Sequence, residues 1–101
     1  MNYETKLNYV VKLVTIKKDY EQAINKLNEI IFDDGIDEFP HFKAQALVMT
    51  LEICFAAESY DDCKEIIELY RAIEFKDTEL DLYEEFSVTI DSIASQLPQS
   101  S

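Results

Sequence analysis

The side chains of this sequence that could take part in catalysis are few and lie far apart. His41 is the only histidine, and the two cysteines are Cys54 and Cys63. A histidine beside Pro40 at a predicted helix start is more often solvated than a general base, and both cysteines stand at apolar positions typical of small core residues. No nucleophile–base set, phosphate-binding loop or nucleotide motif is present. We therefore expect no catalytic residue, no cofactor and no enzymatic activity.

An acidic cluster in the segment DDGIDEFPHF, residues 33–42, resembles a cation site only at first sight. Its members are Asp33, Asp34, Asp37 and Glu38. Their spacing lacks the alternating oxygen ligands and the closing glutamate at the twelfth position that a helix–loop–helix calcium site requires. A solvated loop is the favoured interpretation, and we predict no metal site.

Charge is distributed unevenly along the chain, whose formal net charge is -12. Residues 1–18 carry four lysines against one glutamate, while residues 19–101 carry five basic and twenty acidic groups. An acidic surface repels nucleic-acid phosphate, so direct binding of DNA or RNA is not expected. The simplest role of the acidic residues is to keep the helices soluble, and the alternative is that they attract a basic partner.

Composition predicts a single all-α domain over residues 1–97. A chain of 101 residues fits one domain, and one glycine with two prolines is too little turn material for a multi-stranded β-protein. The longest apolar run, residues 46–57, is too short to cross a bilayer, so no membrane partner is expected. Two cysteines are too few for a secreted disulfide scaffold, which favours the cytoplasm. Beyond Pro98 we predict a frayed tail, residues 98–101.

Helical periodicity recurs five times along the chain. The first apolar stripe consists of Tyr3, Leu7, Val10, Val11 and Val14. The second helix is predicted to begin at Asp19 as N-cap and to end before Gly35, which would take the left-handed conformation. The third, roughly residues 41–58, is apolar nearly all round, so it should be the structural centre. A fourth helix begins near residues 59–61, and a fifth ends at Pro98.

Two segments at an offset of 40 residues indicate a repeated helical hairpin. KDYEQAINKLNEII, residues 18–31, aligns with ESYDDCKEIIELYR, residues 58–71, which pairs Ala23 with Cys63. DYEQAI at 19–24 resembles the start of the second helix of the tetratricopeptide (TPR) repeat family, and SYDDCK resembles it more loosely. The resemblance implies about five helices, with antiparallel helical hairpins stacked TPR-like and a C-terminal capping helix.

The repeats are degenerate by the standard of that family. Their period is 40 residues instead of about 34. Lys18 and Glu58 replace the turn glycine, and Val11 or Leu51 replaces the small residue of the first helix. These departures prevent the transfer of a defined peptide clamp, and a plain helical bundle is the alternative fold.

Two functions fit these features. The first is a small acidic protein–protein interaction module, an adaptor or chaperone, that binds a partner segment on its helical-repeat surface. The second is an acidic inhibitor that mimics nucleic acid and occupies a basic site on an enzyme.

For the first function we predict a partner surface on the first helix and the exposed edge of the third. Apolar side chains that lie off the core stripe, rimmed by lysines, would form it: Tyr9, Leu13, Ile16, Lys6 and Lys12. The same surface would suit a homodimer contact. Packing of Tyr9 and Leu13 against the fifth helix is the alternative.

Overall fold

The structure is a computed structural model that describes residues 3–75 and 77–98. Regular secondary structure in these ranges is helical, which confirms the predicted all-α class with five α-helices. The helices are α1 (Tyr3–Lys12), α2 (Tyr20–Ile31), α3 (Pro40–Ala56), α4 (Tyr60–Arg71) and α5 (Leu80–Gln96). A π-helical turn continues α1, and two 3-10 turns precede α3 and α5: η1 (Leu13–Lys17), η2 (Ile36–Glu38) and η3 (Asp77–Glu79). Of the tail predicted to fray, residues 99–101 lie outside the described residues.

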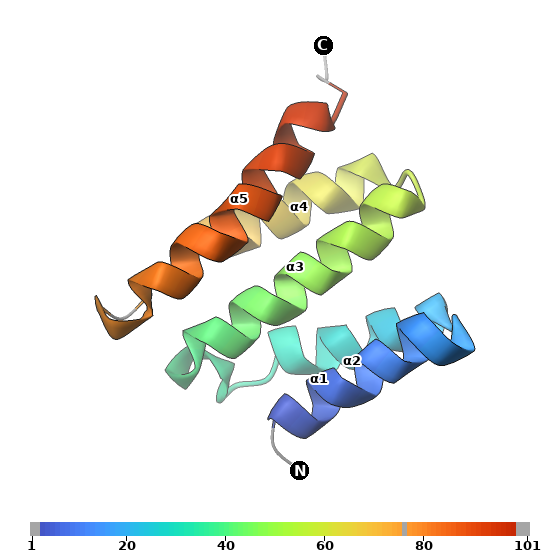
Figure 1. Cartoon of the computed structure of the whole chain (residues 1–101), viewed down its shortest axis with the longest axis horizontal. Coiled ribbons are helices and arrows are strands. Elements are labelled where there is room, and N and C mark those ends of the chain that lie inside the picture. Colours follow the sequence, from blue (N-terminus) through green and yellow to red (C-terminus); the bar gives the residue numbers. More distant parts are fainter. Residues whose placement is uncertain (1–2, 76, 99–101) are drawn as a thin grey trace.

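Figure 1 shows the helices in two layers. α1, α3 and α5 lie in the nearer layer, with α2 and α4 behind them. Each α-helix contacts the next one along the chain, and α3 contacts all four others. α1 and α3 separate toward the end where η1 and the C-terminal end of α3 lie, whereas α5 contacts α3 more extensively than α1 does.

α3 is the structural centre, as its apolar sequence predicted. Its buried residues are Pro40, Ala44, Ala46, Leu47, Val48, Thr50 and Leu51. The Thr50 hydroxyl donates a 2.8 Å hydrogen bond to the carbonyl oxygen of Ala46, so this buried polar group is satisfied. A helix that is apolar on nearly every side must be surrounded by neighbours, and the other four helices supply them.

The turns that follow η1 and α3 have matching geometry. Lys18 and Glu58, 40 residues apart, both adopt the left-handed conformation, with φ of 53° and 61°. α2 and α4 begin two residues after these turns, and each spans twelve residues. Ala23 and Cys63, which the alignment pairs, are both fully buried. The offset of 40 residues therefore relates two equivalent turns and helices, while stacked TPR-like hairpins stay a prediction.

The first helix ends in a turn wider than an α-helical turn. Its last residues are mostly β-branched, which lowers helix propensity. The Thr15 hydroxyl donates a 2.7 Å hydrogen bond to the carbonyl oxygen of Val11, a back-bond of the kind that bends helices. The backbone N–H of Asp19 then donates to the carbonyl oxygen of Leu13 at 2.8 Å and closes the turn.

Leu13 is fully buried, so the expectation that it lies on an exposed surface is wrong. The buried face of the first helix is centred on Val10, and Leu13 lies three residues further on the same face. Val11, which was predicted to belong to the core stripe, is 42% exposed because adjacent helical residues point about 100° apart.

Gly35 does not adopt the left-handed conformation predicted for it. Its φ is -86°, because α2 ends earlier, at Ile31. The Asp33 carboxylate accepts hydrogen bonds from the Gly35 N–H at 2.8 Å and from the Tyr3 hydroxyl at 3.0 Å. A β-carbon on Gly35 would lie 3.1 Å from that hydroxyl oxygen. Glycine is therefore favoured by the close approach of α1, and the acidic loop is tied to α1 rather than fully solvated.

His41 is only partly solvated, which corrects the expectation of a solvated helix-start residue. Its Nδ1 lies 2.9 Å from Oε2 of Glu79, and its ring centroid lies 4.1 Å from that of Phe42. The contact joins the first turn of α3 to the 3-10 turn before α5. The other carboxylate oxygen of Glu79, Oε1, is buried without a hydrogen-bond partner in the described residues.

Candidate partner-binding groove

An apolar groove lies between the end of the first helix and the C-terminal half of α3. Its volume is about 450 Å³, and residues of η1, of the start of α2 and of the end of α3 line it. The lining residues are Val14, Tyr20, Met49, Glu52, Ile53, Ala56 and Ala57. The groove occupies the region where α1 and α3 separate in Figure 1.

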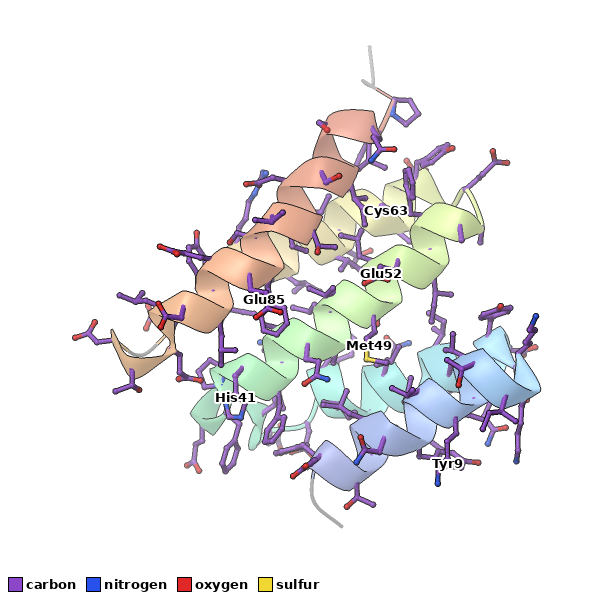
Figure 2. The ribbon with its side chains drawn as sticks, in the orientation of Figure 1. Tyr9, His41, Met49, Glu52, Cys63 and Glu85 are labelled. Carbon is purple, nitrogen blue, oxygen red and sulfur yellow. The ribbon has the colours of Figure 1, made fainter. Side chains whose placement is uncertain are left out.

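The α3 wall of the groove is one helical stripe. Met49, Ile53 and Ala56 recur at spacings of four and three residues, which places them on the same face. Met49 and Ile53 are half-buried, and Ala56 and Ala57 are exposed. Figure 2 shows Met49 on the side of α3 that faces the first two helices. The stripe extends about 10 Å along α3, roughly two helical turns.

The opposite wall depends on the π-helical turn. Val14 lies within η1, and the left-handed residue Lys18 ends that turn just before Tyr20. Tyr20 is 47% exposed although it lines an apolar groove. π-Helical turns are rare and occur often at functional sites. The π-helical turn therefore forms part of one wall of the groove through Val14.

One charged residue, Glu52, lies among the groove-lining residues. It is exposed, and Figure 2 shows it on the nearer face of α3. Within the described part of the chain its carboxylate has no hydrogen-bond or ion-pair partner. The groove therefore combines an apolar floor with one unpaired negative charge at its rim.

The residues predicted to bind a partner lie elsewhere on the first helix. Tyr9 is 38% exposed, and its hydroxyl accepts a 3.3 Å hydrogen bond from the side-chain amide of Gln22 in α2. Figure 2 shows Tyr9 on the side of α1 away from α3. Lys12 and Ile16 are exposed and Lys6 is half-buried. None of them lines the groove.

The groove lies between the two elements that the sequence predicts for the partner surface, the first helix and the edge of the third. Other residues of these elements line it. A signal for the α3 wall was present in the sequence. α3 has more apolar positions than its neighbours cover, and Met49 and Ile53 are the ones left half-buried. Val14 could not be predicted as a groove residue, because its spacing assigns it to the core stripe of the first helix.

Cys54 lies in another groove of the described structure. That groove has a volume of about 280 Å³ and lies between α2 and α4. Burial raises the pKa of the Cys54 thiol to about 11, so the thiol is protonated and weakly nucleophilic at neutral pH. In the described residues no group of three or more His, Cys, Asp or Glu is placed to hold a metal ion. No helix there is both long and apolar enough to span a membrane.

Comparison with known proteins gave no match, whether with protein-family models, with curated proteins or with solved structures. The functional assignment therefore rests on the groove, on the charge of the chain and on the repeat pattern in its sequence.

Proposed function

We propose that this protein is a small acidic interaction module, an adaptor or chaperone without enzymatic activity, that binds a segment of a partner protein in the groove between η1 and α3. The observation that carries this proposal is the apolar groove itself. Apolar surface in contact with water costs roughly 25 cal/mol of free energy per Å². A partner that covers the groove could recover this free energy. An apolar groove between two elements is one of the surfaces on which proteins bind a helix of a partner.

The composition of the groove favours a protein segment over a small molecule. A volume of about 450 Å³ is within the usual range of ligand pockets, so size alone does not decide. Small-molecule sites, however, bury most of the ligand's surface and orient the ligand with a small number of precisely placed polar groups. Here the lining offers one carboxylate and the Tyr20 phenol, and both of these residues are exposed, as are the two alanines. Apolar side chains of a partner fit such a surface better.

A helical segment is the partner structure that the groove favours. Peptide recognition by strand addition requires an exposed sheet edge, and the described residues form no strand. Recognition of a helix in a groove requires an apolar channel between elements, with contacts spaced three and four residues apart. The stripe formed by Met49, Ile53 and Ala56 supplies that spacing. The TPR resemblance of the sequence supports the same class of function, in a cytoplasmic setting.

The second candidate is an acidic inhibitor that mimics nucleic acid. It is favoured by acidic side chains that are exposed along α4 and α5: Asp61, Asp62, Glu65, Glu68, Asp81, Glu84, Glu85 and Asp91. Salt separates the two candidates, since electrostatic binding between exposed charges weakens as the Debye length shortens from about 10 Å at 0.1 M salt to about 3 Å at 1 M. Groove binding should persist through that range, and binding by a mimic should be lost.

Site-specific photo-cross-linking tests the proposal in cells that express the protein. Replacing Tyr20 with p-benzoylphenylalanine keeps an aromatic ring in the groove, and the same replacement at Tyr83, 42% exposed on α5, is the matched control. We expect a discrete protein adduct from position 20 that is absent from position 83. An adduct of equal yield at both positions, or none at position 20, would overturn the proposal.

A further inference from the structure

Glu52 is the feature of the groove that apolar docking alone does not explain. It is the one charged residue among the groove-lining residues, and within the described residues its carboxylate is unpaired. We infer that the groove takes an amphipathic helix of a partner protein that carries a lysine or arginine facing Glu52. This inference rests on the proposed function and adds the chemistry of the partner.

The energetic argument concerns the water around the Glu52 carboxylate. A helix seated on Met49 and Ile53 would displace part of that water, because Glu52 lines the same groove and lies one helical turn from Met49 on the α3 surface. An uncharged partner side chain would leave the carboxylate with fewer hydrogen bonds, and an acidic one would add repulsion. A lysine or arginine replaces the lost hydration with a charge-assisted hydrogen bond.

The charges around the groove also set which edge of the partner helix is basic. Glu58 follows Ala57 directly at the end of α3, so the α3 side of this region carries two acidic residues, Glu52 and Glu58. On the opposite side, the exposed Asp19 and Glu21 flank Tyr20. Lys17 and Lys18 end the opposite wall and are exposed. These lysines offset the charge of Asp19 and Glu21, so a basic edge is attracted mainly to the α3 side. The net charge of -12 further favours a basic partner by long-range attraction.

Three synthetic peptides of about 14 residues, roughly four helical turns, test the inference. They share one apolar face with leucines at spacings of three and four, and they differ only at two flanking positions, which are lysine, glutamine or glutamate. Binding to the full chain is measured by fluorescence anisotropy. The protein variants are Glu52→Gln and Glu52→Lys. Glu85→Gln, at an exposed position of α5, is the control.

We expect the lysine peptide to bind the unchanged protein roughly three- to tenfold more tightly than the glutamine peptide, the effect of a partly desolvated ion pair. Glu52→Gln should remove that preference, Glu85→Gln should keep it, and Glu52→Lys should transfer it to the glutamate peptide. Circular dichroism of each variant confirms that the fold is retained.

Two results would overturn the inference while leaving the proposed function in place, provided that the position-20 cross-link is observed. One is equal binding of the lysine and glutamine peptides. The other is a lysine preference that survives Glu52→Gln, because the attraction would then come from the net charge and not from this residue. Failure of all three peptides to bind also contradicts the inference, and the cross-link then decides the proposed function separately.

Discussion

Asp33 is the residue that ties the acidic loop to the first helix. Its carboxylate accepts hydrogen bonds from the Gly35 N–H and from the Tyr3 hydroxyl. The Gly35 hydrogen bond, followed by the Tyr3 hydrogen bond, holds the pKa of the Asp33 carboxyl below its ordinary value. Desolvation, followed by the bond to Asp33, raises the pKa of the Tyr3 hydroxyl. The acidic loop therefore serves as a structural connection.

A pH-dependent contribution to stability follows from the lowered pKa of Asp33. A carboxyl whose folded-state pKa is lowered stabilises the fold fully above its ordinary pKa of about 4, and the contribution disappears as pH falls through the lowered value. Asp33→Asn should therefore melt below the parent at pH 6, and the difference should shrink below about pH 4. Asp34→Asn, at an exposed neighbour, is the control. A constant difference between parent and Asp33→Asn across this range would contradict the assignment.

Leu13 and Ile16 provide a second test at the residue scale, because they differ completely in their exposure to solvent. Leu13 is 0% exposed and Ile16 is 75% exposed. Leu13→Ala should lower the free energy of unfolding by about 2–5 kcal/mol through lost transfer energy and the cavity left behind. Ile16→Ala should change it by less than about half a kcal/mol. Urea denaturation that shows a loss below about half a kcal/mol for Leu13→Ala would place Leu13 on the surface after all.

The elements of the fold could be predicted because their signals are local. Apolar periodicity located all five helices, Asp19 accepts the N-cap hydrogen bond from the Gln22 N–H at 3.1 Å, and α3 is central. The sequence did not indicate the π-helical turn or the conformation of Gly35, because both involve contacts of individual side chains. The Thr15 hydroxyl bonds to the Val11 carbonyl oxygen at the π-helical turn, and the Tyr3 hydroxyl, 32 residues away in the sequence, leaves little space for a β-carbon at Gly35. Neither contact has a signal in apolar periodicity.

The equivalence of α2 and α4 can be tested at their first turns. Ala23 and Cys63 are fully buried one turn into their helices, where a small side chain lets neighbouring helices approach. Ala23→Leu and Cys63→Leu should each lower the free energy of unfolding by about 1–3 kcal/mol through overpacking. Ala56→Leu, at an exposed position of α3, should have little effect. If either leucine at the buried sites leaves the melting temperature unchanged, the two helices are not close-packed equivalents.

At the scale of the whole molecule, the groove exists because five helices leave one apolar stripe of α3 only partly covered. α2 and α4 pack behind α3 and α5 packs beside it, while α1 separates from it toward η1. The sequence could indicate which elements border the groove, since α3 is apolar all round. It could not indicate the lining residues, because these depend on how far α1 lies from α3.

One affinity measurement tests the central claim, that the groove between η1 and α3 binds the partner. Ala56→Arg places a long side chain in the groove from an exposed position, so the core is left intact. Tyr9→Ser with Ile16→Ser alters the outer surface of the first helix, and Val88→Arg alters an exposed site on α5. Isothermal titration calorimetry measures the affinity of each variant for the partner protein that is cross-linked at position 20. Variants are compared when their melting temperatures match that of the parent. The account predicts at least a tenfold loss of affinity for Ala56→Arg and near-parental affinity for the others. Parental affinity of Ala56→Arg, or loss of binding in the Tyr9 and Ile16 variant, would contradict it.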